Sequence, residues 1–365
     1  MLLRAFRRVN PPWGIGRRRG RRIECSADFL RFLGTHAAAA AVKSFNWEVR
    51  MKLYKLLISA GVMSIVAGAG AYAQSQQDLI KPIDKELTFV FIPKVIHPWY
   101  DVVAEGSKFA AEEFAKSGIK VNVIWDQPPQ ADVADQNQRI ETNIGRKPDG
   151  LAVACLDRAT NVQLLTEAKA AGVNVMTFNS FCDEKFPFVG PKSSYQDGYD
   201  LGEFLAKHLN GKGKVGILAG SLTASDHVER IQGFKKALES HPGMQIVFEQ
   251  PDNDILEEAV TLTENALQAN PDIAGIFGSN ASNPIGAARA VKNAGFAGKI
   301  AIVGMDDLPE AVDAVCDGTI TALKAQRQWD MGYWTVKYLV AANENHTIPM
   351  FHDTGSRFIT KEDCK

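Results

Sequence analysis

The sequence predicts an α/β protein of two lobes, each of them a doubly wound parallel sheet covered by helices. Short apolar runs alternate with longer amphipathic runs along the chain from residue 87 onward. The apolar runs are nearly continuous, which is typical of strands that are buried on both faces of a parallel sheet. The alternation occurs in two successive series of similar length, and this indicates two domains of the same architecture.

The first series covers residues 87–178. Its apolar runs predict buried strands, and the segments between them carry apolar residues at helical spacing, as Val102, Phe109 and Phe114 do. The expected strands are 87–92, 121–125, 150–154 and 173–178, and the expected helices are 101–116, 133–145 and 160–171.

The second series covers residues 199–342 and repeats the pattern without a short-period sequence repeat. Its last member is a long helix. The expected strands are 214–219, 245–248, 273–277, 300–303 and 319–323, and the expected helices are 199–209, 228–238, 256–268, 285–294, 311–315 and 331–342.

A segment that begins at Met51 has the layout of a secretory signal peptide. It has two lysines in its first five residues, an apolar run over 56–66 and a small-residue tripeptide over 71–73. The apolar run is shorter than the ~20 residues that a membrane span needs, and glycines interrupt the segment. We therefore interpret residues 51–73 as a signal peptide that is cleaved near Ala73, which places the rest of the chain outside the cytoplasm.

Residues 1–50 are strongly basic, with eleven Lys and Arg residues against three acidic ones. The arginine-rich run over 17–22 is compatible with a nucleic-acid or targeting patch. It is also compatible with a twin-arginine export signal, although the apolar stretch lies too far downstream. Because signal peptides normally occupy the extreme N-terminus, we interpret residues 1–50 as a non-native upstream extension.

The chain after residue 73 is acidic. Residues 1–73 hold 13 of the 41 Lys and Arg residues but only 3 of the 42 Asp and Glu residues, which leaves 28 basic and 39 acidic residues and a net charge of −11. An acidic domain repels phosphate backbones, so nucleic-acid binding is not expected. The four remaining cysteines, Cys155, Cys182, Cys316 and Cys364, show no metal-binding spacing, and we expect no metal or other cofactor.

Two adjacent aromatic residues, Trp99 and Tyr100, follow the first predicted strand. In parallel sheets ligands bind beyond the carboxyl ends of the strands, and between two domains the natural place is the cleft. Aromatic planes stack well on the CH faces of sugar rings. The alternative is that one of the two rings caps the helix and packs into the core.

Amides and carboxylates follow the ends of four later strands. Such groups supply the directional donors and acceptors that a polyhydroxylated ligand requires. The alternative for Asn280 and Asp306 is that they only cap the following helices. The residues in question are Asn179, Ser180, Asn280, Asp306 and Gln326.

The motifs of several enzyme classes are absent from the sequence. It contains no GxSxG, GxxxxGK[ST] or HExxH pattern. His97, His208, His227 and His241 have no evident Ser or Cys partner, and His227 is expected near the cleft beside Asp226. We therefore predict that the protein is not an enzyme.

Four short motifs occur in the order and spacing of one protein family. They are Ile96-His97-Pro98-Trp99-Tyr100 followed by Gly106, then Glu229-Arg230-Ile231-Gln232-Gly233-Phe234, then Val303-Gly304-Met305-Asp306, and Ala325-Gln326. Through them residues 86–358 resemble the type I periplasmic solute-binding proteins, nearest to the ribose- and galactose-binding branch. The resemblance implies the periplasmic binding protein-like I fold, in which a hinge of three chain crossings joins the lobes.

The resemblance also implies where the lobes begin and end. The crossings are expected near Lys192, Gln326 and Gly355. Residues 86–192 plus 327–355 would form the N-terminal lobe. Residues 193–326 plus 356–365 would form the C-terminal lobe.

Residue by residue, the resemblance implies a ligand site. Trp99 and Tyr100 correspond to the paired aromatics that sandwich the sugar ring. Met305 takes the place of a stacking aromatic, and His97 takes the place of an asparagine. The polar contacts of the second lobe and the hinge are implied for Arg230, Asn280, Asp306 and Gln326.

Two departures from the ribose-binding pattern affect the expected ligand. Cys155 replaces a pocket asparagine, and Asn179-Ser180 replaces an Asp-Arg pair that grips the sugar. The second change removes charge-assisted hydrogen bonds, which are normally the strong ones. The ligand is therefore expected to be a sugar other than ribose in its usual pose, a polyol or a small cyclic polar molecule. Further candidates for ligand contacts are Trp125, Asp126, Arg158 and Trp329.

Two disulfides are hypotheses at this point. Cys155 and Cys182 lie at or just beyond the ends of strands that should be neighbours, although strand position alone does not ensure the required separation. Cys316 and Cys364 are the second candidate pair.

The resemblance implies the periplasmic binding component of an ABC importer. Such a protein would capture a sugar or polyol by hinge closure, act as a monomer and be read by membrane permease subunits. The alternative is a periplasmic sensor that presents its ligand state to a receptor kinase or chemoreceptor. A sugar-responsive repressor shares the fold, but a signal peptide occupies the place of its DNA-binding head.

Overall fold

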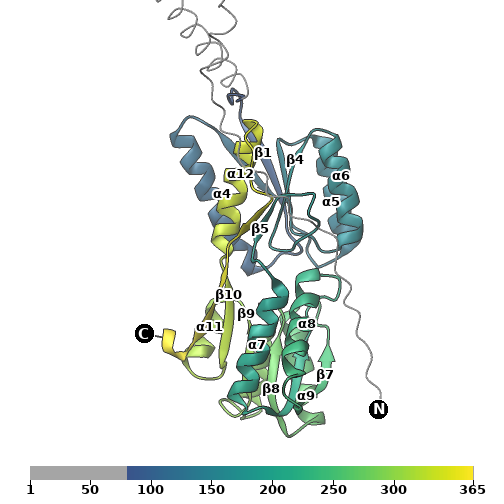
Figure 1. Ribbon diagram of the computed structural model, residues 1–365, viewed down its shortest axis with the longest axis vertical. Helices are drawn as coiled ribbons and strands as arrows, with labels where there is room; N and C mark the ends of the chain where they lie inside the picture. The colour runs from purple at the N-terminus through teal and green to yellow at the C-terminus, as the bar shows by residue number, and fades with distance from the viewer. Residues whose placement is uncertain (1–79, 365) are drawn as a thin grey trace, which may run out of the picture. The chain divides into compact units, whose positions relative to one another are not determined.

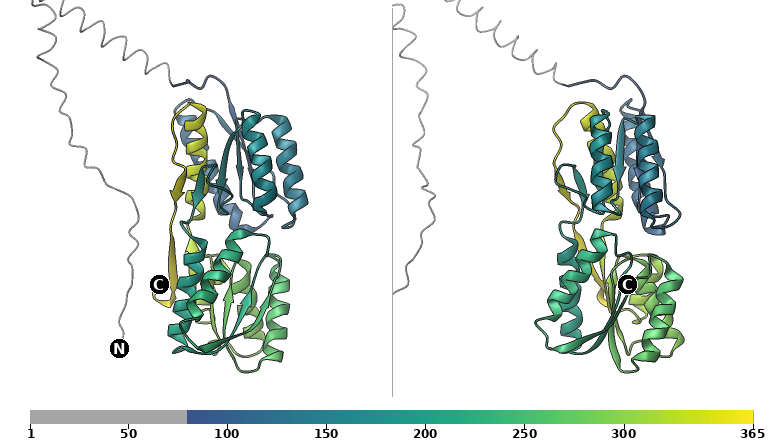
Figure 2. Two further views of the ribbon diagram at one scale, coloured as in Figure 1. Left: turned by 45° about the vertical axis from the view of Figure 1, so that its right-hand side comes forward. Right: turned by 90° about the vertical axis from the view of Figure 1, so that its right-hand side faces the viewer.

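Two six-stranded sheets form the centres of two lobes within residues 80–364, the part of the chain that this computed structural model describes (Figure 1). Helices cover both faces of each sheet, as the rotated views show (Figure 2). The predicted α/β fold with two parallel-sheet lobes is confirmed. The expected signal peptide at 51–73 and the extension at 1–50 lie outside the described residues.

The N-terminal sheet has the strand order β11-β5-β4-β3-β1-β2, and all of its pairs are parallel. Helices α4 and α12 pack together on one face, and α5 and α6 lie on the other (Figure 1). The elements are β1 Leu87–Ile92, α4 Pro98–Lys116, β2 Val121–Trp125, α5 Val133–Arg146, β3 Gly150–Val153, α6 Arg158–Ala170, β4 Asn174–Phe178, β5 Phe188–Gly190, α12 Gln328–Asn343 and β11 Phe351–Asp353.

The C-terminal sheet has the order β12-β10-β9-β8-β6-β7 and is parallel except for the antiparallel edge pair β10–β12. Helices α7 and α8 pair on one face, and α9 and α10 pair on the other. The elements are α7 Ser194–His208, β6 Lys212–Leu218, α8 Ser225–Leu238, β7 Gly243–Gln250, α9 Leu256–Ala269, β8 Ile273–Gly278, α10 Ser282–Asn293, β9 Ala301–Met305, α11 Pro309–Cys316, β10 Ala322–Gln326, β12 Ser356–Thr360 and the 3₁₀ turn η1 Lys361–Asp363.

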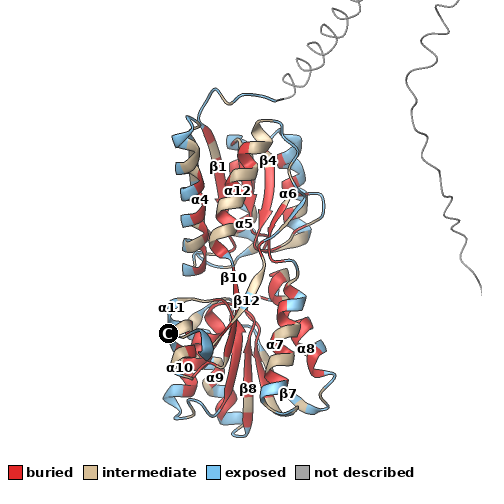
Figure 3. Cartoon of the chain, turned by 60° about the vertical axis from the view of Figure 1, so that its left-hand side comes forward, coloured by how far each residue is buried: buried red, intermediate tan, exposed pale blue. Residues whose placement is uncertain are grey.

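Strand β1 shows why the apolar runs are continuous. Phe89 and Phe91 point into the core beneath α4 and α12, whereas Val90 and Ile92 point into the core beneath α5 and α6. Successive strand side chains point to opposite faces, so a strand covered on both sides needs apolar residues at every position. The inner strands of both sheets are accordingly buried, whereas the edge strands β2, β7, β11 and β12 are only partly buried and the outer faces of the helices are exposed (Figure 3).

The chain passes between the sheets at three points. These are the segments from β5 to α7, from β10 to α12 and from β11 to β12. In the third, Gly355 has a φ of 74°, and its N–H donates to the Asp353 carboxylate at 2.9 Å. The lobe boundaries remain a prediction. Every strand belongs to the sheet that these boundaries predict for it.

The sequence misplaced one strand and missed three. The strand expected at 319–323 lies at Ala322–Gln326, because Thr319 belongs to a turn in which its N–H donates to the Asp317 carboxylate at 2.9 Å. Strands β5, β11 and β12 have only three to five residues, and two of them alternate with polar residues. Runs this short give no periodic signal.

Both candidate disulfides are present. Cys155 pairs with Cys182, with 5.7 Å between their Cα atoms, and Cys316 pairs with Cys364, with 5.5 Å between theirs. The first joins the end of β3 to the loop after β4, and the second joins the end of α11 to the C-terminal segment. The two pairings hypothesised from the sequence are confirmed.

The two lobes share a helix-packing device. In α7 a Cβ atom on Gly198 would lie 1.9 Å from the Arg230 carbonyl oxygen of α8, so only glycine permits this approach. In α4 a Cβ on Gly106 would lie 2.0 Å from the Trp329 carbonyl oxygen of α12. Each lobe thus presses two helix backbones together immediately beside residues that were predicted to bind ligand.

We expect Gly198→Ala to lower the free energy of unfolding by about 2–4 kcal/mol, because the new methyl group must push α7 and α8 apart. Urea denaturation of the two proteins measures this difference. Gly145→Ala is the matched control, since Gly145 lies in helix α5 with nothing within 4 Å of the added atom. That change should leave stability unaltered or raise it by up to about 1 kcal/mol. Equal stabilities of the two variants would contradict the prediction.

Candidate ligand-binding site

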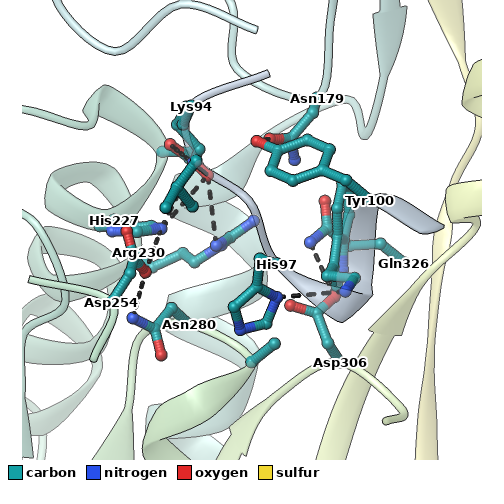
Figure 4. A pocket seen from close by; sticks show the side chains of 14 residues that line it. Lys94, His97, Tyr100, Asn179, His227, Arg230, Asp254, Asn280, Asp306 and Gln326 are labelled. Atoms are coloured by element: carbon teal, nitrogen blue, oxygen red, sulfur yellow. Dashed lines mark hydrogen bonds and ion pairs between the residues drawn. The ribbon is translucent and has the colours of Figure 1, made fainter. Parts of the chain in front are cut away.

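A cavity lies where the two lobes meet, at the carboxyl ends of strands from both sheets (Figure 4). This is the edge at which the sequence predicted a site. The structure brings eight of the predicted residues together around this cavity. They are His97, Trp99, Tyr100, Asn179, Arg230, Asn280, Asp306 and Gln326.

The first turn of α4 supplies the aromatic wall. Pro98 occupies the first helical position, and the Nδ1 atom of the N-cap His97 accepts a hydrogen bond from the Trp99 N–H at 3.1 Å. The rings of Trp99 and Tyr100 meet edge to face, with centroids 4.9 Å apart. Tyr100 also packs against the core ring of Phe178, so the inward-packing alternative holds for part of this ring.

His97 also reaches the other lobe. Its Nε2 lies 2.9 Å from the Ser282 hydroxyl at the start of α10. Because Nδ1 accepts the helix N–H, Nε2 carries the proton and donates to Ser282. Burial lowers the pKa of His97, which keeps the ring neutral in this role.

Two side chains enter the cavity from left-handed backbone positions. Asn179 follows β4 with a φ of 60°, and Asp306 follows β9 with a φ of 70°. Asn and Asp tolerate this region better than other residues with a side chain. Asn179 Oδ1 accepts from the Tyr100 hydroxyl at 3.0 Å. Burial raises the pKa of that hydroxyl well above its usual value, so it remains a donor.

Among the described residues, Arg230 is the largest side chain that is fully buried, and it enters the cavity from α8. Its Nη1 donates to the Ser279 carbonyl oxygen at 3.1 Å and lies 3.4 Å from the Asp226 carboxylate. Its Nε and Nη2 are buried without a hydrogen-bond partner. The close approach of Gly198 to the Arg230 backbone fixes the helix that carries this guanidinium.

Asp306 and Gln326 are paired on the hinge side of the cavity. The Gln326 Nε2 donates to the Asp306 carboxylate at 2.8 Å, while its Oε1 has no partner. Burial raises the pKa of Asp306 to about 6, although the nearby Arg230 opposes this shift. The carboxylate is thus held where ionisation is costly.

Asn280 both caps a helix and lines the cavity. Its Oδ1 accepts from the Asn283 N–H at 2.9 Å, as the capping alternative predicted. Its Nδ2 donates to Asp254, which also lines the cavity. Behind them lies Asp252, whose carboxylate accepts from the Asn283 side chain at 2.6 Å.

A buried ion pair crosses the cleft at the cavity. Lys94 Nζ, from the loop after β1, lies 2.9 Å from both carboxylate oxygens of Asp226 in α8. Burial alone would raise the pKa of Asp226, but the Lys94 ammonium together with His227 and Arg230 holds it well below its usual range. Burial, followed by Lys94, lowers the pKa of His227 to about 4, so this histidine is neutral at pH 7.

Sequence reasoning missed Lys94 and Asp254 as cavity residues and mentioned Asp226 only as a neighbour of His227. Both missed residues follow the ends of strands, β1 and β7, which is the criterion that found the others. Lys94 stands beside the aromatic motif, and Asp254 belongs to a short acidic run over 252–254. Applying the strand-end criterion to the strand expected at 245–248 would have included Asp254, whereas Lys94 follows a strand to which the criterion was applied.

Three predicted residues lie away from the cavity wall. Cys155 is fully buried in a disulfide, and Met305 is the last residue of β9, whose side chain packs into the core beneath α7 and α8. Ser180 lies behind the wall, where its hydroxyl donates to Asp226 at 2.9 Å. The further candidates Trp125, Asp126, Arg158 and Trp329 do not line this cavity either.

Several buried polar atoms around the cavity have no hydrogen-bond partner in the protein. The donors are Trp99 Nε1 and Arg230 Nε and Nη2, and the acceptors are Asp254 Oδ2 and Gln326 Oε1. A buried polar atom without a partner is costly, so such a cluster indicates a ligand that completes it. A hydroxyl group both donates and accepts, and several hydroxyls on one ring would satisfy both kinds of atom.

Within residues 80–364, no group of His, Cys, Asp or Glu side chains is arranged to hold a metal ion. In the same part of the chain, no helix combines the length and apolar character that a bilayer crossing requires.

Residues 89–346 match the family described as the periplasmic binding protein domain. The D-ribose/D-allose-binding protein of Pseudomonas aeruginosa is 30% identical over 252 residues, which are 67% of this chain and 77% of that protein. The D-allose-binding periplasmic protein of Escherichia coli is 26% identical over 312 residues, covering 82% of this chain and 94% of that protein.

Solved structures show the same architecture. An ABC transporter solute-binding protein from Burkholderia graminis in complex with D-arabinose is 31% identical, with a TM-score of 0.73, and the match covers 78% of this chain and 98% of that chain. A periplasmic solute-binding protein from Actinobacillus succinogenes with bound D-allose is 25% identical, with a TM-score of 0.69, over 76% and 98% of the two chains.

The raised pKa of Asp306 predicts a pH dependence of stability. An Asp that ionises near 3.8 when unfolded and near 6 when folded binds its proton more tightly in the folded state. The free energy of unfolding should therefore fall as the pH rises from 4 to 6, by up to about 3 kcal/mol for this group. Asp306→Asn removes the group, so its stability relative to the wild type should improve over that range.

Chemical denaturation at several pH values between 4 and 7 measures this difference. Asp272→Asn is a control, because a hydrogen bond from Lys214 lowers the pKa of this surface carboxylate. The stabilising contribution of the ionised Asp272 is lost only when the pH falls below 4. The difference in unfolding free energy between Asp272→Asn and the wild type should therefore stay constant from pH 4 to 7. A constant difference for Asp306→Asn as well would refute the raised pKa.

Proposed function

The chain belongs to the periplasmic binding protein family, and from this membership and its cavity we propose that it captures a sugar or related polyol for an ABC importer. The convergence of unpaired donors and acceptors beside the Trp99 ring carries the proposal. Aromatic faces hold the apolar side of a sugar ring, and charged or amide groups hold its hydroxyls. The members of this family are substrate-binding proteins.

The proposed substrate class is pentoses, hexoses and the polyols related to them. Relatives and neighbours are named for, or contain, D-ribose, D-allose and D-arabinose. The contacts proposed for this chain come from the aromatic wall, Arg230, Asp306 and Gln326, with Asp254 as an addition. Asn179 is neutral, so the N-terminal lobe would hold the ligand mainly through Trp99 and Tyr100.

The proposed mechanism is closure of the two lobes around the ligand about the three chain crossings. The cavity is lined from both lobes, so a ligand that touches both walls binds the closed form better than the open one. Only such differential affinity allows a ligand to drive closure. The closed monomer would then deliver the ligand to permease subunits in the inner membrane.

We further propose that residues 51–73 direct export to the periplasm, with cleavage near Ala73. The support is the basic, apolar and small-residue order of that segment.

If the protein serves an importer, deleting its gene should abolish uptake of the ligand. Loss of a signalling response with normal uptake would favour the sensor alternative.

We expect one or a few pentoses, hexoses or polyols to raise the melting temperature of the protein spanning residues 74–365. A ligand that binds only the folded state stabilises it by mass action, by about 2.7 kcal/mol at a hundredfold excess over Kd. A thermal-shift panel on protein unfolded and refolded to remove carried ligand makes the measurement, and calorimetry confirms each positive. No shift with any sugar or polyol would reject the proposed substrate class.

Trp99→Ala should weaken binding of the ligand so identified by about 10- to 100-fold, because it removes a buried ring from the cavity wall. Isothermal titration calorimetry measures the affinity. Trp329→Ala is the matched control, since Trp329 stacks on Tyr333 outside the cavity and should leave Kd within about twofold. If both variants bind like the wild type, the proposed contact of Trp99 with the ligand is wrong.

A further inference from the structure

The Lys94–Asp226 pair joins the lobes directly, without a ligand between them. The two residues are 132 positions apart, one on each side of the cleft, and their side chains are only 6% and 2% exposed. Lys94 Nζ is 2.9 Å from each carboxylate oxygen. His227 lies 3.4 Å from the same ammonium group, so two side chains of the C-terminal lobe lie against the Lys94 head (Figure 4).

A second protein bond crosses the cleft nearby, from His97 Nε2 to the Ser282 hydroxyl. The polar groups that the N-terminal lobe offers at the cavity are therefore mostly engaged with protein. Lys94 is bound to Asp226, His97 to Ser282, and the Tyr100 hydroxyl to Asn179. The unpaired atoms lie mainly on the C-terminal lobe and the hinge, at Arg230, Asp254 and Gln326.

The surroundings of the pair compensate for its burial. A buried ion pair contributes only when its geometry is good and further hydrogen bonds satisfy the remaining atoms. The Ser180 hydroxyl donates to Asp226 at 2.9 Å, and Arg230 lies 3.4 Å from the same carboxylate. If the lobes separate, Lys94 and Ser180 leave Asp226, which keeps Arg230 of its own helix beside it.

We propose that Lys94 and Asp226 are positioning residues that hold the two lobes together, so that a closed form is populated in the ligand-free protein. The inference rests on the proposed hinge closure but not on the identity of the ligand. The C-terminal lobe and the hinge would make most of the hydrogen bonds to the ligand, while the N-terminal lobe closes through its own bonds to protein. A populated closed form raises apparent affinity by reducing the conformational cost of binding.

The test is a distance distribution between the lobes. Spin labels are placed at Gln130→Cys, in the loop after β2, and at Glu258→Cys, at the start of α9 after β7. Strands β2 and β7 are the edge strands opposite β11 and β12, which the third chain crossing joins. Both positions are exposed, and neither lines the cavity. Double electron–electron resonance on the ligand-free protein, with both disulfides intact, should give a short-distance population.

Lys94→Met and Asp226→Asn should each shift the ratio of closed to open populations about tenfold or more towards the open form. Each single change leaves one buried charge without its partner in the closed form. The double variant should recover part of the closed population, because neither charge then remains. Affinity for a sugar or polyol identified by the thermal-shift panel should fall in each single variant and recover in part in the double variant.

Glu229→Gln is the matched control. Glu229 and Arg158 also form an ion pair between the lobes, at 2.6 Å, but their side chains are 32% and 41% exposed. Exposed pairs contribute little, so this change should alter the population ratio by less than about twofold. Circular dichroism melting confirms that each variant is folded before its distances are measured.

Three results would overturn the proposal. They are a ligand-free wild type that is open only, single variants with unchanged distances, and a control that opens the lobes as much as Asp226→Asn does. These distances do not depend on any sugar. A negative sugar panel with the expected distances would reject the substrate class alone, and the converse result would reject only the contact between the lobes.

Discussion

The burial of charge where the two lobes meet is the constraint on which the rest of this structure depends. Lys94, Asp226, Arg230 and Asp306 are each at most 4% exposed, and a charge removed from water is costly unless it is paired and hydrogen-bonded. Other protein groups pair most of these charges, but the Nε and Nη2 atoms of Arg230 still lack a hydrogen-bond partner. The proposed closure would therefore be coupled to ligand binding, because both determine whether these charges have partners.

The lobes meet this constraint as rigid platforms. Glycines press α7 against α8 and α4 against α12, which fixes the helices that carry Arg230 and the aromatic wall. Left-handed turns after two strands direct Asn179 and Asp306 into the cavity. A site held by packed backbone keeps its geometry, so in the proposed closure the motion would be confined to the crossings.

The sequence predicted both sheets and most of the cavity, because long buried strands give a clear pattern and strand ends converge by topology. It failed where one residue decides the direction of a side chain. Met305 and Asp306 are adjacent, yet strand alternation and a left-handed turn send the first into the core and the second into the cavity. The short hinge strands and the role of Lys94 depend on tertiary pairing, which a single sequence does not display.

The distribution of donors and acceptors also limits what the cavity can hold. Its unpaired donors belong to Trp99 and Arg230, and its unpaired acceptors to Asp254 and Gln326. A ligand carboxylate only accepts, and a ligand ammonium only donates, so either would leave one set unsatisfied. Hydroxyl groups do both, and a ring that carries several can satisfy both sets while its CH face lies on the Trp99 ring. Lys94 and Asp226 are already paired with each other, so this part of the cavity suits a neutral, polyhydroxylated molecule.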